Sequence, residues 1–408
     1  AVKNSDRYRN MKTEGYSEEE ILQSFQKPVR MWVYTCDGEK DTVMTPMDSI
    51  RYMKSFLSCG LMAMEPSTGH VKAYVGGTNY NYFQYAHVTQ ARRQVGSTFK
   101  PFIYTFAMQE GEFSPCTKVP NLPVTIETED GQVWTPRNSN DYKAGQMISL
   151  KDALANSLNY VSAYLMKRYG PGAIIQLVRK MGVTSDIPAV PSICLGTCEL
   201  TLYEMVGAVN TFNNKGVYVK PIFITRICNN KGNIIANFQT EQSEAMDEVS
   251  AYKTVQLMKG VVAYGTGVRL NYRYKMDMPI AGKTGTTDNN SDGWFMGYTP
   301  MLTAGVWVGC EDRAAHFRST SLGQGANSAL PVWALFVKKC YASLWGNRAV
   351  CYRLNQGYDQ QSVALAIVIQ EMVESETAGV LFTVNPVTKD PSQIQINASY
   401  GLGESVVS

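Results

Sequence analysis

Histidine is scarce in this sequence. Only three are present, His70, His87 and His316, among 408 residues, and they are widely separated along the chain. A catalytic triad built on histidine needs that residue beside a nucleophile, and a zinc site needs several ligands at short spacing. The scarcity of histidine therefore argues against both classes of site.

The sequence also lacks a strong excess of charge and any long apolar run. Its net charge is +3, with 18% charged residues, so nothing points to nucleic acid as a partner. No apolar run approaches the ~18 residues that a membrane span requires, and no signal peptide precedes the first residues. The chain begins at Ala1 without an initiator methionine. We interpret it as an excised piece of a longer protein and expect any membrane anchor to lie upstream.

The nine cysteines do not form a metal-binding pattern. Cys194 and Cys198 are the closest pair in the first three hundred residues, but the second Cys or His pair of a zinc site is missing. We predict a few buried thiols, with room for one local disulfide. Cysteine usage does not decide the compartment.

Length and composition favour a large core or more than one domain. The chain is 44% hydrophobic, and 33 Gly and 24 Tyr favour many turns and strands over a helical bundle. Periodicity, caps and turn signals predict a helix start at 17–20, a strand at 31–34, a helix at 46–56, a hairpin at 60–77, a loop-rich stretch at 111–147, helices at 149–166 and 202–212, strands near 218–227 and 234–238, and a helix from about 251 to 265.

Ser97 and Lys100 form the first chemical pair. On a helix their spacing places both side chains on one face. Pro101 is tolerated only in a first turn, so we expect the helix to begin near Ser97, at the positive end of its dipole. A neighbouring amine can take the proton of a serine if burial keeps that amine partly neutral. The alternative is a plain helix cap at Ser97.

The second chemical group is Ser157-Leu158-Asn159. Serine and asparagine are mediocre inside helices, so we predict a break between two helices with both side chains pointing into a cleft. The alternative is a helix kink with ordinary capping residues.

The third group is Lys283-Thr284-Gly285 with Thr286, on a predicted strand. Thr284 and Thr286 would present hydroxyls on one face, Lys283 supplies positive charge, and Gly285 would leave room for a ligand backbone. This is a plausible receptor for a carboxylate. The alternative is an ordinary Lys/Thr surface strand.

Two similar-looking motifs are rejected. A phosphate-binding loop ending at Gly282-Lys283-Thr284 would need glycine at position 277, which is Asp277. A calcium loop starting at Asp288 would need glutamate at position 299, which is Thr299.

Taken together, Ser-x-x-Lys, Ser-x-Asn and Lys-Thr-Gly in this order are the signature of class A β-lactamases and penicillin-binding proteins, with Leu158 where the usual form has Asp. The chain from 1 to about 338 resembles the transpeptidase domain of a class A penicillin-binding protein, and no glycosyltransferase motif is visible. The matching surroundings are Arg93–Pro101, Trp134-x-Pro-x-Asn138, Gly265-Thr-Gly267 and Asp292-x-Trp-Phe295.

The resemblance implies an α/β fold like that of serine β-lactamases. A five-stranded antiparallel sheet carries Lys283, helices flank it, and an all-helical subdomain carries Ser157. It also implies the roles. Ser97 attacks the bond between two D-alanines of a stem peptide, Lys100 takes its proton, and Ser157 relays a proton to the leaving amine. Asn159 holds the peptide. The terminal carboxylate is bound by Lys283, Thr284 and Thr286, Gly285 is a further substrate-binding residue, and the N–H groups of Ser97 and Thr286 form the oxyanion hole.

The implied partners are peptidoglycan stem peptides and β-lactam antibiotics, with no nucleic acid and no cofactor. The expected location is the bacterial cell envelope, at the periplasmic face of the inner membrane, with a membrane anchor and a glycosyltransferase domain upstream. A penicillin-binding sensor that is acylated without turnover remains an alternative. The extra carboxylate that β-lactamases use for deacylation has no assigned counterpart here.

From about Val337 the sequence changes, and four segments carry a second resemblance: 340–353, 369–373, 378–386 and 397–404. They resemble the ATP-grasp domain of phosphoenolpyruvate synthase and rifampicin phosphotransferase. That resemblance places Gln370 to Val373 near an adenine and makes Arg348 and Glu404 candidate phosphate or magnesium groups. ATP and magnesium would be cofactors only if this incomplete tail were functional, and an ATP-dependent phosphotransferase is the alternative function. Because an incomplete site cannot assemble its ligands, we expect an inactive passenger in a chimeric sequence. The predicted domains are a linker or pedestal at 1–59, the transpeptidase at 60–338 and a partial ATP-grasp-like segment at 339–408.

Overall fold

The computed structural model describes the chain except for residues 128–130, 132, 230, 344–376, 383–394 and 401–408. It divides into two units, Ala1–Ile367 and Val368–Ser408, and each is described by itself. Within the described residues, no helix has the length and apolar character needed to cross a membrane.

The N-terminal region is a small helical and hairpin layer. Ser17 and Glu20 form a reciprocal capping box, which starts the second helix where the sequence predicted it. Thr45 caps the third helix and Pro46 occupies its first turn, where no backbone N–H is needed. The elements are η1 (Val2–Asn4), α1 (Asp6–Thr13), α2 (Glu18–Ser24), β1 (Val29–Thr35), β2 (Gly38–Met44) and α3 (Pro46–Lys54).

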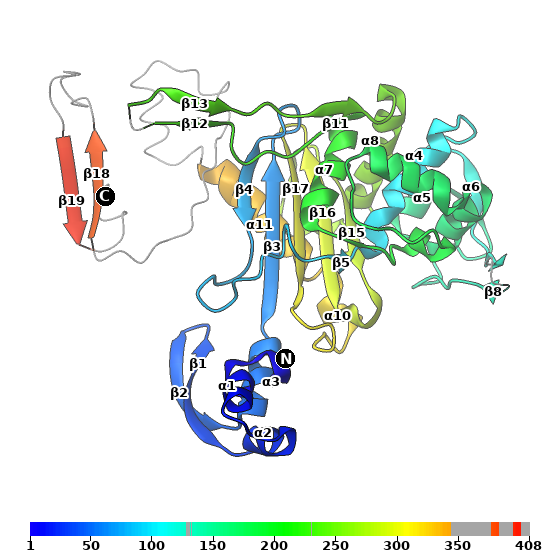
Figure 1. The fold of residues 1–408 in the computed structure, drawn as a ribbon. Helices are drawn as coiled ribbons and strands as arrows, with labels where there is room; N and C mark the ends of the chain where they lie inside the picture. Colours follow the sequence, from blue (N-terminus) through cyan, green and yellow to red (C-terminus); the bar gives the residue numbers. More distant parts are fainter. Residues whose placement is uncertain (128–130, 132, 230, 344–376, 383–394, 401–408) are drawn as a thin grey trace. The chain divides into compact units, whose positions relative to one another are not determined.

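A five-stranded antiparallel sheet forms the centre of the first unit (Figure 1). The strand order is β15-β16-β17-β3-β4. The predicted hairpin at 60–77 is confirmed as the β3–β4 pair, and the Lys283 strand is the edge strand β15. The strands are β3 (Leu57–Met64), β4 (Val71–Val75), β15 (Ala281–Thr286), β16 (Asp292–Thr299) and β17 (Leu302–Cys310).

Alternate strand residues supply two separate cores. Met62 and Trp294 belong to one buried cluster, whereas their neighbours Leu61 and Phe295 belong to the other, as the two-residue period of a strand requires. The second cluster is closed by α11 (Ala329–Ser343), whose Trp333 is fully buried. Because both faces of the sheet are covered, most residues of its strands are buried, and buried polar ones such as Lys283 and Asp292 have hydrogen-bond or ion-pair partners.

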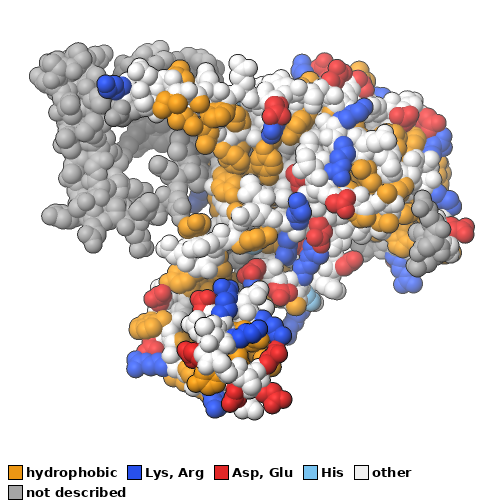
Figure 2. All heavy atoms as spheres, in the orientation of Figure 1, with side chains coloured by type: hydrophobic (Ala, Val, Ile, Leu, Met, Phe, Trp, Pro, Cys, Tyr) orange, Lys and Arg blue, Asp and Glu red, His pale blue; other side chains and the backbone are white. Residues whose placement is uncertain are grey.

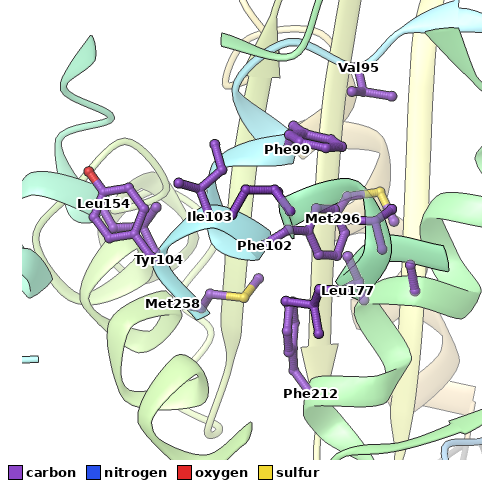
Figure 3. Close-up of a cluster of buried hydrophobic side chains, with 14 of the residues drawn as sticks. Val95, Phe99, Phe102, Ile103, Tyr104, Leu154, Leu177, Phe212, Met258 and Met296 are labelled. Atoms are coloured by element: carbon purple, nitrogen blue, oxygen red, sulfur yellow. The ribbon is translucent and has the colours of Figure 1, made fainter. Parts of the chain in front are cut away.

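Helices cover the first face of the sheet. α5 packs on α8 and α4 packs on α6, and Figure 3 shows part of the apolar cluster that joins them to the sheet, from Phe99 and Phe102 to Met296. α6 is interrupted at Gly170, where φ is +76°, just before Pro171. These elements are α4 (Lys100–Gln109), α5 (Leu150–Ala155), α6 (Asn159–Lys180), η3 (Pro191–Leu195), α7 (Leu202–Asn213), α8 (Glu248–Ala263) and α9 (Arg269–Tyr272).

The remaining strands form short antiparallel pairs. The β12–β13 pair and the residues just before it form an arm whose large apolar side chains are exposed, and Figure 2 shows them gathered along it. They are Phe223, Ile224, Ile227, Ile234, Ile235 and Phe238. The pairs are β5 (Arg93–Gln94) with β10 (Glu199–Leu200), β6 (Lys118–Pro120) with β9 (Met147–Ser149), β7 (Ile126–Glu127) with β8 (Val133–Trp134), β11 (Val217–Val219) with β14 (Gln242–Glu244), and β12 (Arg226–Cys228) with β13 (Ile234–Asn237). In the second unit β18 (Thr377–Phe382) pairs with β19 (Gln395–Tyr400).

The described cysteines are all free thiols, so the room left for one local disulfide is not used among them. Cys194 and Cys198 are both buried, and burial raises the pKa of each thiol to about 12. Their predicted role as small buried hydrophobic residues is confirmed.

Candidate active site

Ser97 lies in the short 3-10 helix η2 (Gly96–Phe99), which leads directly into α4. Pro101 occupies the first turn of α4, so the predicted start of the helix near Ser97 is confirmed. Phe99 is fully buried below the turn, and Ser97 itself is half-buried. Gly96 has a φ of +55°, and a Cβ there would meet the carbonyl oxygen of Thr286 at 2.7 Å. Glycine at this position allows the nucleophile turn to approach β15.

Lys100 is buried completely at the base of the cleft. Its Nζ donates to the backbone oxygen of Ser157 and to Oδ1 of Asn159, both at 2.6 Å, and lies 3.3 Å from Oγ of Ser157. Burial, which disfavours the ammonium form, lowers the pKa of Lys100 to about 7. Among the described residues, no hydrogen bond joins Lys100 to Ser97. The amine of Lys100 is instead held by Ser157 and Asn159.

Ser157 lies in the break between α5 and α6, which confirms the predicted interruption. Its φ of +56° is unusual for a residue with a side chain, and such strain is concentrated at functional sites. Two amines reach its hydroxyl, Lys100 Nζ at 3.3 Å and Lys283 Nζ at 3.0 Å. The structure therefore joins the three motifs through one oxygen atom.

Asn159 is positioned by residues to which the sequence analysis gave no role. Oδ1 of Asn138 accepts from the backbone N–H of Asn159 at 2.7 Å and of Tyr160 at 3.1 Å, so it satisfies free donors at the start of α6. The amide of Asn159 donates to the backbone oxygen of Arg137 at 2.6 Å. Asn138 belonged to a quoted motif, but nothing in the loop-rich stretch around it indicated a partner in α6.

Lys283 is also fully buried, on β15. Besides Ser157, its Nζ contacts the backbone oxygen of Thr284 at 2.9 Å. Burial and then the nearby charge of Lys100 hold the pKa of Lys283 well below its ordinary value. Two amines that share one hydroxyl repel each other when both are charged, so protonation of either opposes protonation of the other.

The threonines of β15 have partners from outside the motif. Oγ1 of Thr284 lies 2.6 Å from Oγ1 of Thr266, and Oγ1 of Thr286 accepts from the backbone N–H of Gly325 at 3.0 Å. Thr266 lies in the Gly265-Thr-Gly267 turn, which the sequence analysis quoted only as part of a resemblance. These contacts fix the hydroxyls at the rim of the cleft.

The reason given for Gly285 was wrong. A Cβ on Gly285 would meet Val95 O and Thr98 Cγ2, both at 2.8 Å, so its bare face is covered by the nucleophile turn and is not open to a ligand. Glycine is needed at this position because atoms of Val95 and Thr98 lie directly against the backbone of β15 and leave no room for a side chain. A role of Gly285 in substrate binding stays a prediction.

A cleft of about 640 Å³ brings the predicted residues together. Its lining includes Ser97, Ser157, Asn159, Thr284 and Thr286, with Lys100 and Lys283 reaching Ser157 from below. Size and polarity suit an extended peptide ligand, since pockets of ~300–1,000 Å³ bury most of a small ligand.

A buried ion pair lies behind the nucleophile turn. Nε of Arg93 is 2.6 Å from Oδ1 of Asp292, and Arg93 also donates to the backbone oxygens of Cys310 and Glu311. The same Asp292 oxygen accepts from the indole of Trp307 at 2.9 Å. This network ties β5, four residues ahead of Ser97, to the start of β16 and the end of β17.

The transpeptidase match covers most of the chain. The description "Penicillin binding protein transpeptidase domain" matches residues 59–311, and "Penicillin-binding protein middle domain" matches residues 1–57. The chain belongs to the penicillin-binding protein transpeptidase family. This confirms the resemblance to class A penicillin-binding proteins and the predicted fold.

Penicillin-binding proteins 1A are similar in sequence. The Aquifex aeolicus protein is 32% identical over 282 residues, 69% of this chain and 38% of its own length. The Neisseria lactamica protein is 34% identical over 290 residues, 69% of this chain and 36% of its own length. The chain thus spans little more than a third of these relatives.

Solved penicillin-binding proteins have the same fold. PonA1 from Mycobacterium tuberculosis superimposes with a TM-score of 0.59 at 25% identity, covering 68% of this chain and 76% of that one. Penicillin-binding protein 1A from Haemophilus influenzae gives a TM-score of 0.64 at 16% identity, covering 95% and 65%, and supports the fold alone.

The C-terminal part is similar to a second family, as the sequence predicted. "Pyruvate phosphate dikinase, AMP/ATP-binding domain" matches residues 245–408, which overlaps the transpeptidase match at 245–311. In the structure the overlapping residues form α8, α9 and the strands β15 to β17 of the central sheet. Arg348 and Glu404, predicted for phosphate or magnesium, lie outside the described residues. The predicted domain limits at 59 and 338 stay predictions.

Proposed function

We propose that this chain is a serine D,D-transpeptidase that cross-links peptidoglycan stem peptides through an acyl-enzyme on Ser97. One observation supports the proposal above all others. A serine at a helix start, two buried amines and a strained serine, from three distant segments, meet in one cleft. The proposed place of the reaction is the extracytoplasmic side of the cell envelope.

Acylation begins at Ser97 Oγ. As the bond from this oxygen to the substrate carbonyl carbon forms, its proton passes to neutral Lys100, which a pKa of about 7 makes available near neutral pH. The negative charge that develops on the carbonyl oxygen is stabilised by the backbone N–H groups of Ser97 and Thr286. The C–N bond then breaks. The departing D-alanine amine takes a proton from Lys100 through Ser157. The hydroxyl of Ser157 already contacts Nζ of Lys100.

The second half-reaction reverses these transfers. An amine from a neighbouring stem attacks the ester carbonyl, its proton passes to Lys100, and Ser97 Oγ leaves and regains a proton. The new amide is the cross-link. No cofactor enters either step as proposed.

Substrate recognition is assigned to β15 and Asn159. Lys283, Thr284 and Thr286 would bind the terminal carboxylate of the donor, and Asn159 its peptide amide. A bound carboxylate would raise the pKa of Lys283 again, because an opposite charge favours the ammonium form. Binding of the substrate carboxylate would therefore favour the ammonium form of Lys283.

Labelling with a fluorescent penicillin tests the nucleophile. We expect the intact chain to gain one covalent label and the Ser97→Ala variant to gain none, with Ser243→Ala, an exposed serine on β14, as matched control. PonA1, which has the same fold, is described in complex with penicillin V, with a TM-score of 0.58. An unlabelled intact chain, or a label that persists in Ser97→Ala, would overturn the proposal. Release of D-alanine from a stem-peptide analogue would separate a transpeptidase from a non-turnover sensor.

The rate of acylation should depend on pH in a definite direction. Below a pKa of about 7 Lys100 is protonated and cannot accept the Ser97 proton, so the rate should rise with pH through about 7 and level off above it. Stopped-flow quenching of intrinsic fluorescence by a β-lactam, at saturating concentration between pH 5 and 9, measures this. A rate independent of pH over that range would rule out Lys100 as the base.

A further inference from the structure

A second cavity lies apart from the catalytic cleft. It has a volume of about 710 Å³ and shares no lining residue with the cleft among the described residues. Its walls come from the loop ahead of β5, the turn after α6, the start of α7 and the strand β11. The mechanism proposed above uses none of these residues.

The lining of this cavity has an unusual chemistry. Among its described lining residues no aliphatic side chain occurs: three tyrosines, Tyr85, Tyr203 and Tyr218, are surrounded by a glycine and by hydroxyl, amide and charged side chains. Ordinary small-molecule pockets are mostly apolar with few polar groups. Flat ring faces between many hydrogen-bonding groups suit a ligand that is itself rich in hydroxyls and amides and has apolar C–H faces.

The tyrosines are held in place before any ligand arrives. The hydroxyl of Tyr203 donates to the backbone oxygen of Pro221 at 2.8 Å, and its ring stacks on Phe223 with centroids 6.0 Å apart. The ring of Tyr218 lies over Gly182, where a Cβ would come within 2.1 Å of it. Such fixed rings lose little freedom on binding.

Glu204 fixes the part of the wall formed by the turn after α6 and the start of α7. Its buried carboxylate accepts six hydrogen bonds, from the backbone N–H and hydroxyl groups of Thr184, Ser185 and Thr201. Burial opposes its ionisation, but these hydrogen bonds outweigh burial and lower the pKa of Glu204 to about 2. The turn after α6 is thereby tied to the start of α7. The remaining charges are mixed: Lys220 pairs with Glu241 at 2.7 Å, and Arg92 is exposed.

We propose that this cavity binds the sugar strand of peptidoglycan, and this rests on the proposed transpeptidase function. A glycan offers pyranose faces to the tyrosines, hydroxyl and acetamido groups to the polar side chains, and a lactyl oxygen or carboxylate to Arg92. The nearly balanced charge of the lining fits such a weakly acidic polymer better than it fits a polyanion.

The distance to the nucleophile supports the assignment. Arg92 at the cavity and Ser97 in the cleft are five residues apart, so their Cα atoms are at most about 18 Å apart even if that segment is fully extended. An extended stem peptide of about five residues spans the same length. Under the proposal, a stem peptide attached to a glycan in the cavity is thus long enough to reach Ser97.

Binding of glycan alone tests the proposal. The probe is a peptide-free oligosaccharide of alternating N-acetylglucosamine and N-acetylmuramic acid, titrated calorimetrically into the intact chain. We expect saturable binding that weakens at least tenfold in Tyr85→Ala and in Arg92→Ala, both exposed positions that should not affect folding. Tyr16→Ala, an exposed tyrosine of the N-terminal region, is the matched control. Cross-linking of glycan-attached stems should fall in the two cavity variants, while that of free stem peptides stays unchanged.

Three results would overturn the site: no binding by the intact chain, binding unaffected by both variants, or equal competition by a free stem peptide. Penicillin labelling of Ser97 serves as the independent readout and should be the same in the intact chain and both variants. Glycan binding without any penicillin labelling would overturn the transpeptidase proposal and leave the sugar site standing.

Discussion

Replacing Lys100 by methionine should slow the acylation of Ser97 by a β-lactam by about 10²- to 10⁴-fold, the usual contribution of a general base. Methionine has nearly the same shape and keeps the buried site filled. It cannot accept a proton, and it also removes the donor that holds Asn159 Oδ1 and the backbone oxygen of Ser157. The rate constant is measured by stopped-flow fluorescence or by quenched labelling with fluorescent penicillin.

The pH profile separates a lost base from a disturbed cleft. In Lys100→Met the residual rate should no longer change near pH 7, whereas a distorted cleft would lower the rate without removing that inflection. Lys180→Met, an exposed lysine in the last turn of α6, is the matched control and should acylate normally. A Lys100→Met variant that acylates within threefold of the parent would contradict the assignment.

Replacing Arg93 by methionine should lower the free energy of unfolding by about 3 kcal/mol, the lower end of the cost of removing one partner of a buried ion pair. Asp292 is fully buried and would lose its close ion-pair partner, keeping the more distant Arg313, whose Nε lies 3.8 Å from Oδ2, and the backbone oxygens of Cys310 and Glu311 would lose their donors. Urea unfolding followed by tryptophan fluorescence suits this test, because the indole of Trp307 contacts the same carboxylate.

A double-mutant cycle isolates the pair itself. Asp292→Asn alone should also destabilise, and the double variant Arg93→Met with Asp292→Asn should lose clearly less than the sum of the two single losses, because neither partner is then left charged and alone. Arg30, which pairs with Asp41 on the surface, provides the control: Arg30→Met should hardly move the unfolding midpoint. Additive effects at Arg93 and Asp292 would show that the two side chains do not act as a pair.

The local structure around each motif could be predicted because it depends on neighbours in sequence. Pro101 requires a helix start near Ser97, Ser157 and Asn159 are poor residues for a helix interior, and alternating apolar residues define the β3–β4 hairpin. Residue types and spacing were enough to name the candidate residues. The family then supplied roles, which remain proposals for this chain.

The spacing of residues along the sequence does not reveal the three-dimensional environment of each candidate residue. The low pKa of Lys100 depends on burial by segments far along the chain, and no pattern near Lys100 announces it. Asn138 is remote from Asn159 in sequence, and its part in capping α6 became visible only when the loop was placed. Gly285 was misread for the same reason, because the atoms that cover its bare face, Val95 O and Thr98 Cγ2, come from the nucleophile turn.

The amino-acid sequence by itself determined the helix start at Ser97, the break at Ser157 and the strand at Lys283, since each follows from the conformational preferences of a few adjacent residues. Only the tertiary structure decided that both lysines reach the hydroxyl of Ser157. The same holds for the second cavity, which brings Tyr85, Tyr203 and Tyr218 together. Distances between remote segments are set by packing of the whole core, which acts on all of them at once.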